Sequence, residues 1–317
     1  MSTVATTTTT TSEEHVHIHN STPSFFGLIR GEFFKVFRQW TTWILLVLLL
    51  GVIILPYIIE FTVPNVKTNI QTDSLHFFYN ILSVGLSIVR VFTGIFLLVI
   101  TARIVGLEYQ LGTIRVLLSR GVGRLQLLFA KLLTVAIIAL ILLVIGLVLN
   151  YLLTLILVAG VTGNLNAYSA LNSQFWSDAL TYVLTILLNM AVTILLAVAA
   201  SVVGRSLSFG LSAALIFFPI DNIGTIIMQL AYRVTHNDFW LSATAYFLGP
   251  NLNTMPTAIS GKLESIGASP IFIPASPAGQ SHGIQVDGTH TIVVAVVYGV
   301  IFAAVAIFLT WRRDVME

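Results

Sequence analysis

The sequence contains no cysteine, which excludes disulfides, a thiol nucleophile and a cysteine-bound metal ion. Charge is also scarce, because Asp, Glu, Lys and Arg make up only 9% of the 317 residues, whereas soluble domains carry roughly a quarter. Several apolar runs reach the ~20 residues that a helix needs to cross a bilayer. The ~10-residue alternating segments of a membrane β-barrel are not seen. We therefore predict an all-α polytopic membrane protein.

The apolar runs predict six membrane-spanning helices within one transmembrane domain, residues 41–317. The first run begins too far into the chain for an ordinary signal peptide, so we expect it to be a retained span. We expect Pro219 to interrupt the fifth span. The six spans are predicted at about 43–59, 84–104, 133–159, 178–203, 209–232 and 291–311.

The positive charges predict the orientation of the chain. With the N-terminus inside, only Lys67, Arg90, Arg233 and Lys262 of the fifteen Lys and Arg residues fall on the outer side. Cytoplasmic loops of membrane proteins are enriched in Lys and Arg. We therefore predict a multi-pass protein of the cell membrane with both termini in the cytoplasm.

The N-terminal residues divide into a tail and a helix. Residues 1–24 are Thr-rich and are expected to be disordered. His15, His17 and His19 alternate in this tail, where they either bind a metal ion or, as we favour, are simply solvated. Residues 25–40 predict an amphipathic helix whose polar face includes Glu32 and Lys35. A basic helix of this kind is typical of the membrane interface, and the alternative is a cytoplasmic extension of the first span.

The segment after the second predicted span has an ordered pattern of residues. Glu108 is followed by Gly112 and Thr113, then by Leu117-Leu118-Ser119, by Arg120 and Arg124, and by Lys131 at the start of the third span. This pattern resembles the permease subunits of ABC-2 type transporters, and the resemblance extends from Phe25 to the C-terminus. The chain departs from it at Gly121-Val122-Gly123, where many members have a proline, and we expect a looser turn there.

The resemblance implies an exporter subunit that couples to a separate ATPase. Residues 105–124 would form the coupling segment, and the large outer loop, residues 233–290, would contain short re-entrant helices. The other reading of the arginines is that they obey the positive-inside rule and touch lipid head groups. The residues that the resemblance implies for ATPase coupling are Glu108, Gly112, Thr113, Arg115, Arg120 and Arg124.

The same resemblance implies the partners. These are an ABC ATPase subunit, a second permease in a homodimer or heterodimer, and membrane lipid, but not nucleic acid. No G-x-x-x-x-G-K-[ST] phosphate loop occurs in the sequence, so ATP is expected to bind the partner and this chain is expected to need no cofactor. Small residues in the second and fifth spans, such as Gly85, Gly94 and Gly210, would permit close helix approach.

Two charges fall inside the predicted spans. Counted at 1.5 Å per residue from the inner boundary, Arg90 and Asp221 lie at nearly the same depth, with Asn189 and Asn222 close to that level. Because intramembrane charges are costly unless they are paired or hydrated, we predict a polar layer with an Arg90–Asp221 pair. The alternative is that Arg90 extends to the outer head groups and Asp221 lies in a re-entrant turn.

Three classes of function remain open at this point. The first is the ABC-2 type permease. The second is a stand-alone secondary transporter or channel that uses Arg90 and Asp221, although we see no internal repeat of the kind many such transporters have. The third is an intramembrane enzyme, which we disfavour because the spans contain no nucleophile elbow, no His-Glu-x-x-His pair and no paired acids beside a histidine. No metal site is predicted.

Overall fold

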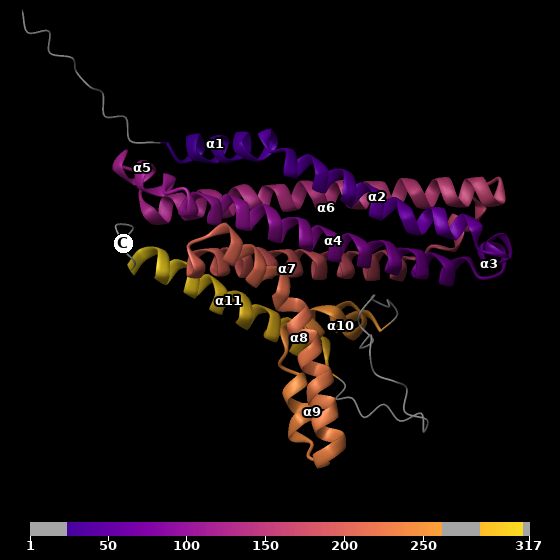
Figure 1. The fold of residues 1–317 in the computed structure, drawn as a ribbon. Helices are drawn as coiled ribbons and strands as arrows, with labels where there is room; N and C mark the ends of the chain where they lie inside the picture. The colour runs from indigo at the N-terminus through magenta and orange to yellow at the C-terminus, as the bar shows by residue number, and fades with distance from the viewer. Residues whose placement is uncertain (1–23, 262–285, 313–317) are drawn as a thin grey trace, which may run out of the picture.

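The computed structural model describes residues 24–261 and 286–312, and the regular structure in these ranges is entirely helical (Figure 1). Six helices are long and apolar enough to cross a membrane, which confirms the predicted fold class. They are α2 (Trp40–Thr62), α4 (Ser74–Gln110), α6 (Arg124–Thr162), α7 (Ser173–Gly204), α8 (Leu207–Thr235) and α11 (Gly288–Arg312). Shorter helices precede or connect them: α1 (Phe25–Arg38), α3 (Val66–Thr72), α5 (Thr113–Ser119), the 3-10 helix η1 (Asn166–Ala170), α9 (Phe239–Thr244) and α10 (Leu248–Ser260).

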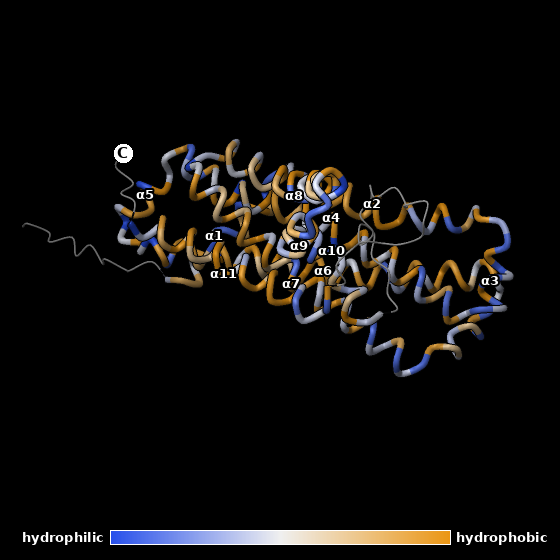
Figure 2. Tube along the Cα trace, turned by 90° about the horizontal axis from the view of Figure 1, so that it is seen from below, coloured by the Kyte–Doolittle hydropathy of each residue, from blue (hydrophilic) through white to orange (hydrophobic). Residues whose placement is uncertain are grey.

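Helices α2, α4, α6, α7 and α11 run side by side and define two ends of the bundle (Figure 1). In Figure 1, α1, α5 and the C-terminal end of α11 lie at one end, and α3 lies at the other. Figure 2 shows hydrophobic residues along the helices and hydrophilic residues at these two ends and around α8, α9 and α10. We call the first of them the α5 end.

Helices α4 and α6 are much longer than the spans predicted for them. They contain 37 and 39 residues, or about 55 and 58 Å at 1.5 Å per residue. The hydrocarbon core of a bilayer is only about 30 Å thick. Each helix therefore extends beyond the hydrophobic layer or crosses it at a tilt. Because α4 ends only at Gln110, Glu108 lies within this helix.

Helix α1 packs against the bundle with only part of its predicted apolar face. Its buried residues are Ile29, Glu32 and Val36, whereas Phe26, Phe34, Phe37 and Trp40, at the start of α2, are exposed. Glu32 was predicted on the polar side of the helix, but at 100° per residue it lies only 40° from Val36 and 60° from Ile29, so it is buried with them and that prediction is wrong. The backbone at Gln39 is extended, so α1 and α2 are separate helices. That α1 lies in the membrane interface stays a prediction.

The core lies between α4 and α7, which are the most buried of the six long helices. Leu97 and Ile100 of α4 belong to the same buried cluster as Met190 and Ile194 of α7. The start of α8 crosses this pair closely: a Cβ built on Gly106 would lie 2.9 Å from the Cα of Leu207. Glycine at 106 therefore sets the distance between α4 and α8.

Helix α8 is the least buried of the long helices and stands away from the bundle, with α9 at its far end (Figure 1). It continues through Pro219 as one helix, so the predicted interruption is not observed. Helix α10 packs its Leu248, Leu252 and Met255 against α7 and α11. The predicted tail with His15, His17 and His19, and the part of the outer loop around residues 269–277, lie outside the described residues.

Candidate functional site: the coupling segment and its charge network

Two glycines shape the turns on either side of α5. Gly112 follows α4 with φ +68° and Gly121 follows α5 with φ +82°. This left-handed conformation is open to glycine at no steric cost. The chain therefore leaves α4, makes the two turns of the short helix α5, and turns again into α6.

The segment has an apolar cluster of its own. Ile114, Val122 and Leu127 are buried together, with Leu28 of α1 packed against them. The Gly121-Val122-Gly123 turn was predicted to be loose, but Val122 fixes it by burying its side chain between α5 and α6. Packing of this kind holds α5 in a defined position on the ends of α4 and α6.

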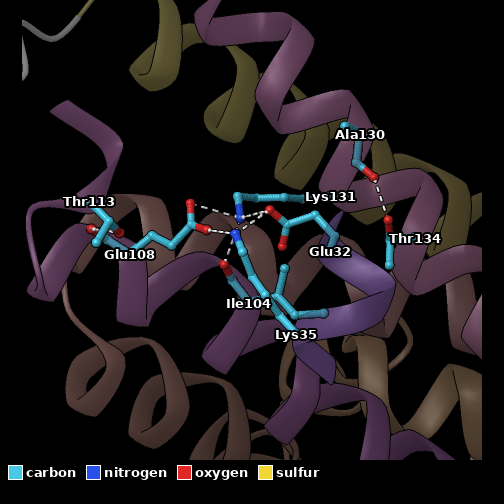
Figure 3. A network of polar contacts seen from close by, with 8 residues as sticks. All are labelled: Glu32, Lys35, Ile104, Glu108, Thr113, Ala130, Lys131 and Thr134. Atoms are coloured by element: carbon cyan, nitrogen blue, oxygen red, sulfur yellow. Dashed lines mark hydrogen bonds and ion pairs between the residues drawn. The ribbon is translucent and has the colours of Figure 1, made fainter. Parts of the chain in front are cut away.

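Behind α5, four charged side chains from three helices meet (Figure 3). The Nζ of Lys35 lies 2.9 Å from Glu32 Oε1 and 2.6 Å from Glu108 Oε1. The Nζ of Lys131 lies 3.0 Å from Glu32 Oε1 and 2.9 Å from Glu108 Oε2, and it donates to the carbonyl of Ile104 at 3.0 Å. We call Glu32, Lys35, Glu108 and Lys131 the charge network. It joins α1, α4 and α6.

The charges of the network balance, since two ammonium groups face two carboxylates. The side chains of Lys131 and Glu32 are only 3% and 4% exposed, whereas that of Lys35 is 48% exposed. Burial alone would lower the pKa of Lys35, but its hydrogen bonds to Glu108 and Glu32 outweigh this effect and hold the pKa above its ordinary value. Lys35 therefore stays charged at neutral pH.

The structure divides the predicted coupling residues into two groups. Arg115 and Arg120 are exposed, as is Thr113, whose hydroxyl donates to the Glu108 carbonyl at 3.4 Å. The Glu108 carboxylate instead faces inward, toward Lys35 and Lys131 of its own chain. Our prediction that it pairs with a partner protein is therefore replaced by an internal ion pair.

Sequence reasoning missed Glu32 and Lys35 as members of this site. Both were placed on the polar face of an amphipathic helix, and Lys131 was noted only as the residue that opens the third span. One signal in the sequence was available, because charged residues are scarce in this chain. Burying a carboxylate or an ammonium group costs free energy unless the two form an ion pair.

A cavity of about 460 Å³ lies beside the network at the α5 end. Its walls come from the ends of α4, α6, α7 and α11 and from α5 itself. Arg115, Arg124, Lys131 and Arg205 line it together with apolar side chains, and no acidic side chain of the described residues does so. The predicted coupling residue Arg124 thus faces a cavity, and its side chain is only partly exposed.

The second predicted site, the polar layer, is arranged differently from the prediction. Arg90 is 2% exposed and donates from Nη1 to the carbonyl of Leu252 at 2.6 Å. The Asp221 carboxylate accepts a hydrogen bond from the backbone N–H of Gly249. Both charges are therefore directed to α10 and not to each other, and the predicted Arg90–Asp221 pair is not formed.

The two asparagines of the layer are separated. Asn222 lies beside Asp221 near Gly249 and accepts from the Asn253 amide at 3.4 Å, so it shares the contact with α10. Asn189 accepts from Thr193 on its own helix at 3.3 Å. The structure thus brings Asp221 and Asn222 together at the start of α10 and places Arg90 one turn further along it.

Six apolar helices, connected in this way, define a multi-pass membrane protein. Residues 28–221, more than half of the chain, match the family described as ABC-2 family transporter protein, and the chain belongs to that family. It is therefore the membrane component of a transporter and is not itself catalytic. The matched range includes the charge network, α5 and the cavity residues of α4 to α7. Searches of curated proteins and of solved structures found no match.

Proposed function

We propose that this chain is the permease subunit of an ATP-driven exporter, which moves a solute out of the cytoplasm. A separate ATPase subunit binds and hydrolyses ATP and docks at the α5 end. This end faces the cytoplasm, the protein lies in the cell membrane, and two permeases, identical or related, form the transport unit. Family membership supports the proposal, because ABC-2 permeases typically work with an ATPase partner.

One observation carries this proposal: α5 is a small exposed helix fixed between the two longest helices of the protein. The buried charge network joins their ends and adds α1 to them. A force applied to α5 is therefore transmitted to α1, α4 and α6 together, since a close-packed interior transmits strain. A partner that moves on ATP hydrolysis needs such a rigid attachment point.

The outer surface of α5 fits a protein partner. Arg115 and Arg120 are exposed beside the exposed apolar side chains of Leu111 and Val116. Apolar residues bordered by arginine are typical of protein interfaces, where arginine is enriched and lysine is depleted. Charge complementarity on this surface would set the register of docking.

Reversing the charge of the docking surface tests the proposal. We expect the double variant R115E/R120E to recover at least about tenfold less ATPase in a co-purification from native membranes, because like charges across an interface cost several kcal/mol. The matched control is R38E, which reverses an exposed arginine on α1 outside the coupling segment. Loss with both variants, or with neither, would contradict docking at α5. Transport in liposomes without partner or ATP would instead support a stand-alone carrier.

Single-cysteine labelling tests the orientation separately. The sequence has no cysteine, so Ser119→Cys on α5 and Thr68→Cys on α3 each introduce one thiol at an exposed position. We expect a membrane-impermeant maleimide to label Thr68→Cys on intact cells, and Ser119→Cys only after permeabilisation. The reverse pattern would place α5 outside and would exclude a cytoplasmic ATPase as its partner.

A further inference from the structure

Helix α10 contains a proline at a position where the helix interior needs a backbone donor. Pro256 is the ninth of the 13 residues of this helix, and it is buried. In an α-helix the carbonyl of residue 252 accepts a hydrogen bond from the N–H of residue 256. Proline has no N–H, and its ring clashes with the carbonyl four positions earlier. The carbonyl of Leu252 therefore loses its usual donor, although this residue is only 3% exposed.

Arg90 of α4 donates a hydrogen bond to this carbonyl. Its Nη1 lies 2.6 Å from the Leu252 oxygen, and Arg90 is 2% exposed. A hydrogen bond from a charged donor is roughly twice as strong as one between neutral groups. A guanidinium inside a membrane span is costly unless it has acceptors. The bond therefore gives a donor to the carbonyl that Pro256 frees and an acceptor to the charge of Arg90.

Helix α10 is attached to the bundle by contacts of two kinds. Its apolar side chains, Leu252 and Met255 among them, pack in a cluster with α7 and α11. Its polar contacts come from charged residues of two other spans: Asp221 of α8 accepts from the Gly249 N–H, and Arg90 of α4 donates to Leu252. Because the Arg90 bond is not one of the backbone bonds of α10 itself, breaking it separates α10 from Arg90 without unfolding the helix.

We propose that Arg90 and Pro256 form a latch, which holds α10 against α4 and allows it to detach as an intact helix. Pro256 frees the Leu252 carbonyl, and Arg90 positions α10 by binding it. When α10 detaches, water must replace each partner, because a buried polar group without a hydrogen bond is costly. Detachment therefore admits water to the depth of Arg90, and in a transporter this makes α10 a movable lid. The latch does not depend on the ATPase partner.

A thiol reporter on α10 tests the latch in the purified full chain. The chain has no cysteine, so Met255→Cys, at a position only 1% exposed, should react with N-ethylmaleimide only when α10 detaches. We expect Arg90→Met to raise the rate of this reaction at least about tenfold, because a hydrogen bond to a charged group is lost.

A second substitution tests the role of the proline. In Pro256→Ala the new N–H supplies the Leu252 carbonyl with a donor, so the effect of Arg90→Met in this background should be at least about threefold smaller. Any other contact of Arg90 is lost in both backgrounds and cancels in the comparison.

Two controls separate the latch from other causes. Pro250 lies in the first turn of α10, where backbone N–H groups have no partner within the helix, so Pro250→Ala should leave the effect of Arg90→Met unchanged. Met190→Cys, at a position 2% exposed in α7, should react as slowly with Arg90→Met as without it. An equal rise at residue 190 would show a general loosening of the bundle and would overturn the proposal. So would an unchanged rate for Met255→Cys, or an equal effect of Arg90→Met with and without Pro256→Ala.

Discussion

Replacing Lys131 with methionine is expected to destabilise the protein by about 3–5 kcal/mol, the usual cost of removing one partner from a buried ion pair. Lys131 is the cation that both glutamates of the charge network share in the buried interior, and it also donates to the Ile104 carbonyl. Its loss leaves Glu32 and Glu108 facing each other with only the half-exposed Lys35 between them. Thermal unfolding of the purified chain in detergent would measure the change.

Two further variants test whether charge balance is the cause. The double variant E32Q/K131M retains one lysine and one glutamate, so it should recover a large part of the stability that K131M loses. Lys35→Met removes a cation from the same network at its exposed side, where water replaces part of the interaction, and should cost less than half as much. A double variant no more stable than K131M would show that packing of the lysine side chain, and not its charge, is what matters.

Replacing Gly106 with alanine is expected to cost about 1–3 kcal/mol, the range for overpacking a close contact. The new methyl group would lie 2.9 Å from the Cα of Leu207 and from the carbonyl oxygen of Ser206. Both are backbone atoms, which do not rotate away as a side chain does. The start of α8 must therefore shift, and the end of α7, including Arg205, must shift with it.

Gly94 provides the matched control within the same helix. A Cβ at this position meets nothing within 4 Å, so Gly94→Ala should be neutral or stabilising by up to about 1 kcal/mol, because alanine loses less backbone entropy in a helix. Comparing the melting temperatures of the two variants removes helix propensity from the result. Equal destabilisation by both would contradict the close contact between α4 and α8.

The six spans could be predicted because lipid imposes a strong condition on sequence: about 20 apolar residues in a row. The ends of α4 could not, because it continues as a helix beyond its apolar stretch, where polar residues mark the end of the hydrophobic layer but not of the helix. At Pro219 the sequence predicted an interruption of the helix that is not observed. A proline predicts a break from local geometry, but α8 continues through it.

For the site, the sequence singled out the segment between the second and third spans, whose role in coupling stays a prediction, but it did not predict the direction of the charges there. The contacts of Glu108 and Glu32 join residues far apart in the chain, with separations of 73 for Lys35–Glu108 and 99 for Glu32–Lys131. A sequence pattern indicates the face of a helix on which such residues lie, but it does not identify the neighbouring helix that they meet. The acceptor of the Arg90 hydrogen bond could not be predicted for another reason. It is a backbone carbonyl of α10, and every residue has a backbone carbonyl, so no residue type marks it.

Helix α4 contains a residue of each of the two sites, Glu108 of the charge network and Arg90 of the polar layer. Eighteen positions separate Glu108 from Arg90, a distance of about 27 Å along the axis. If α4 tilts as a rigid body by about 5° around Glu108, Arg90 moves by about 2 Å, enough to break its hydrogen bond to Leu252 if α10 stays in place. A small rotation at the α5 end is thus enlarged into a displacement deep in the membrane, and α10 must follow α4 or separate from it.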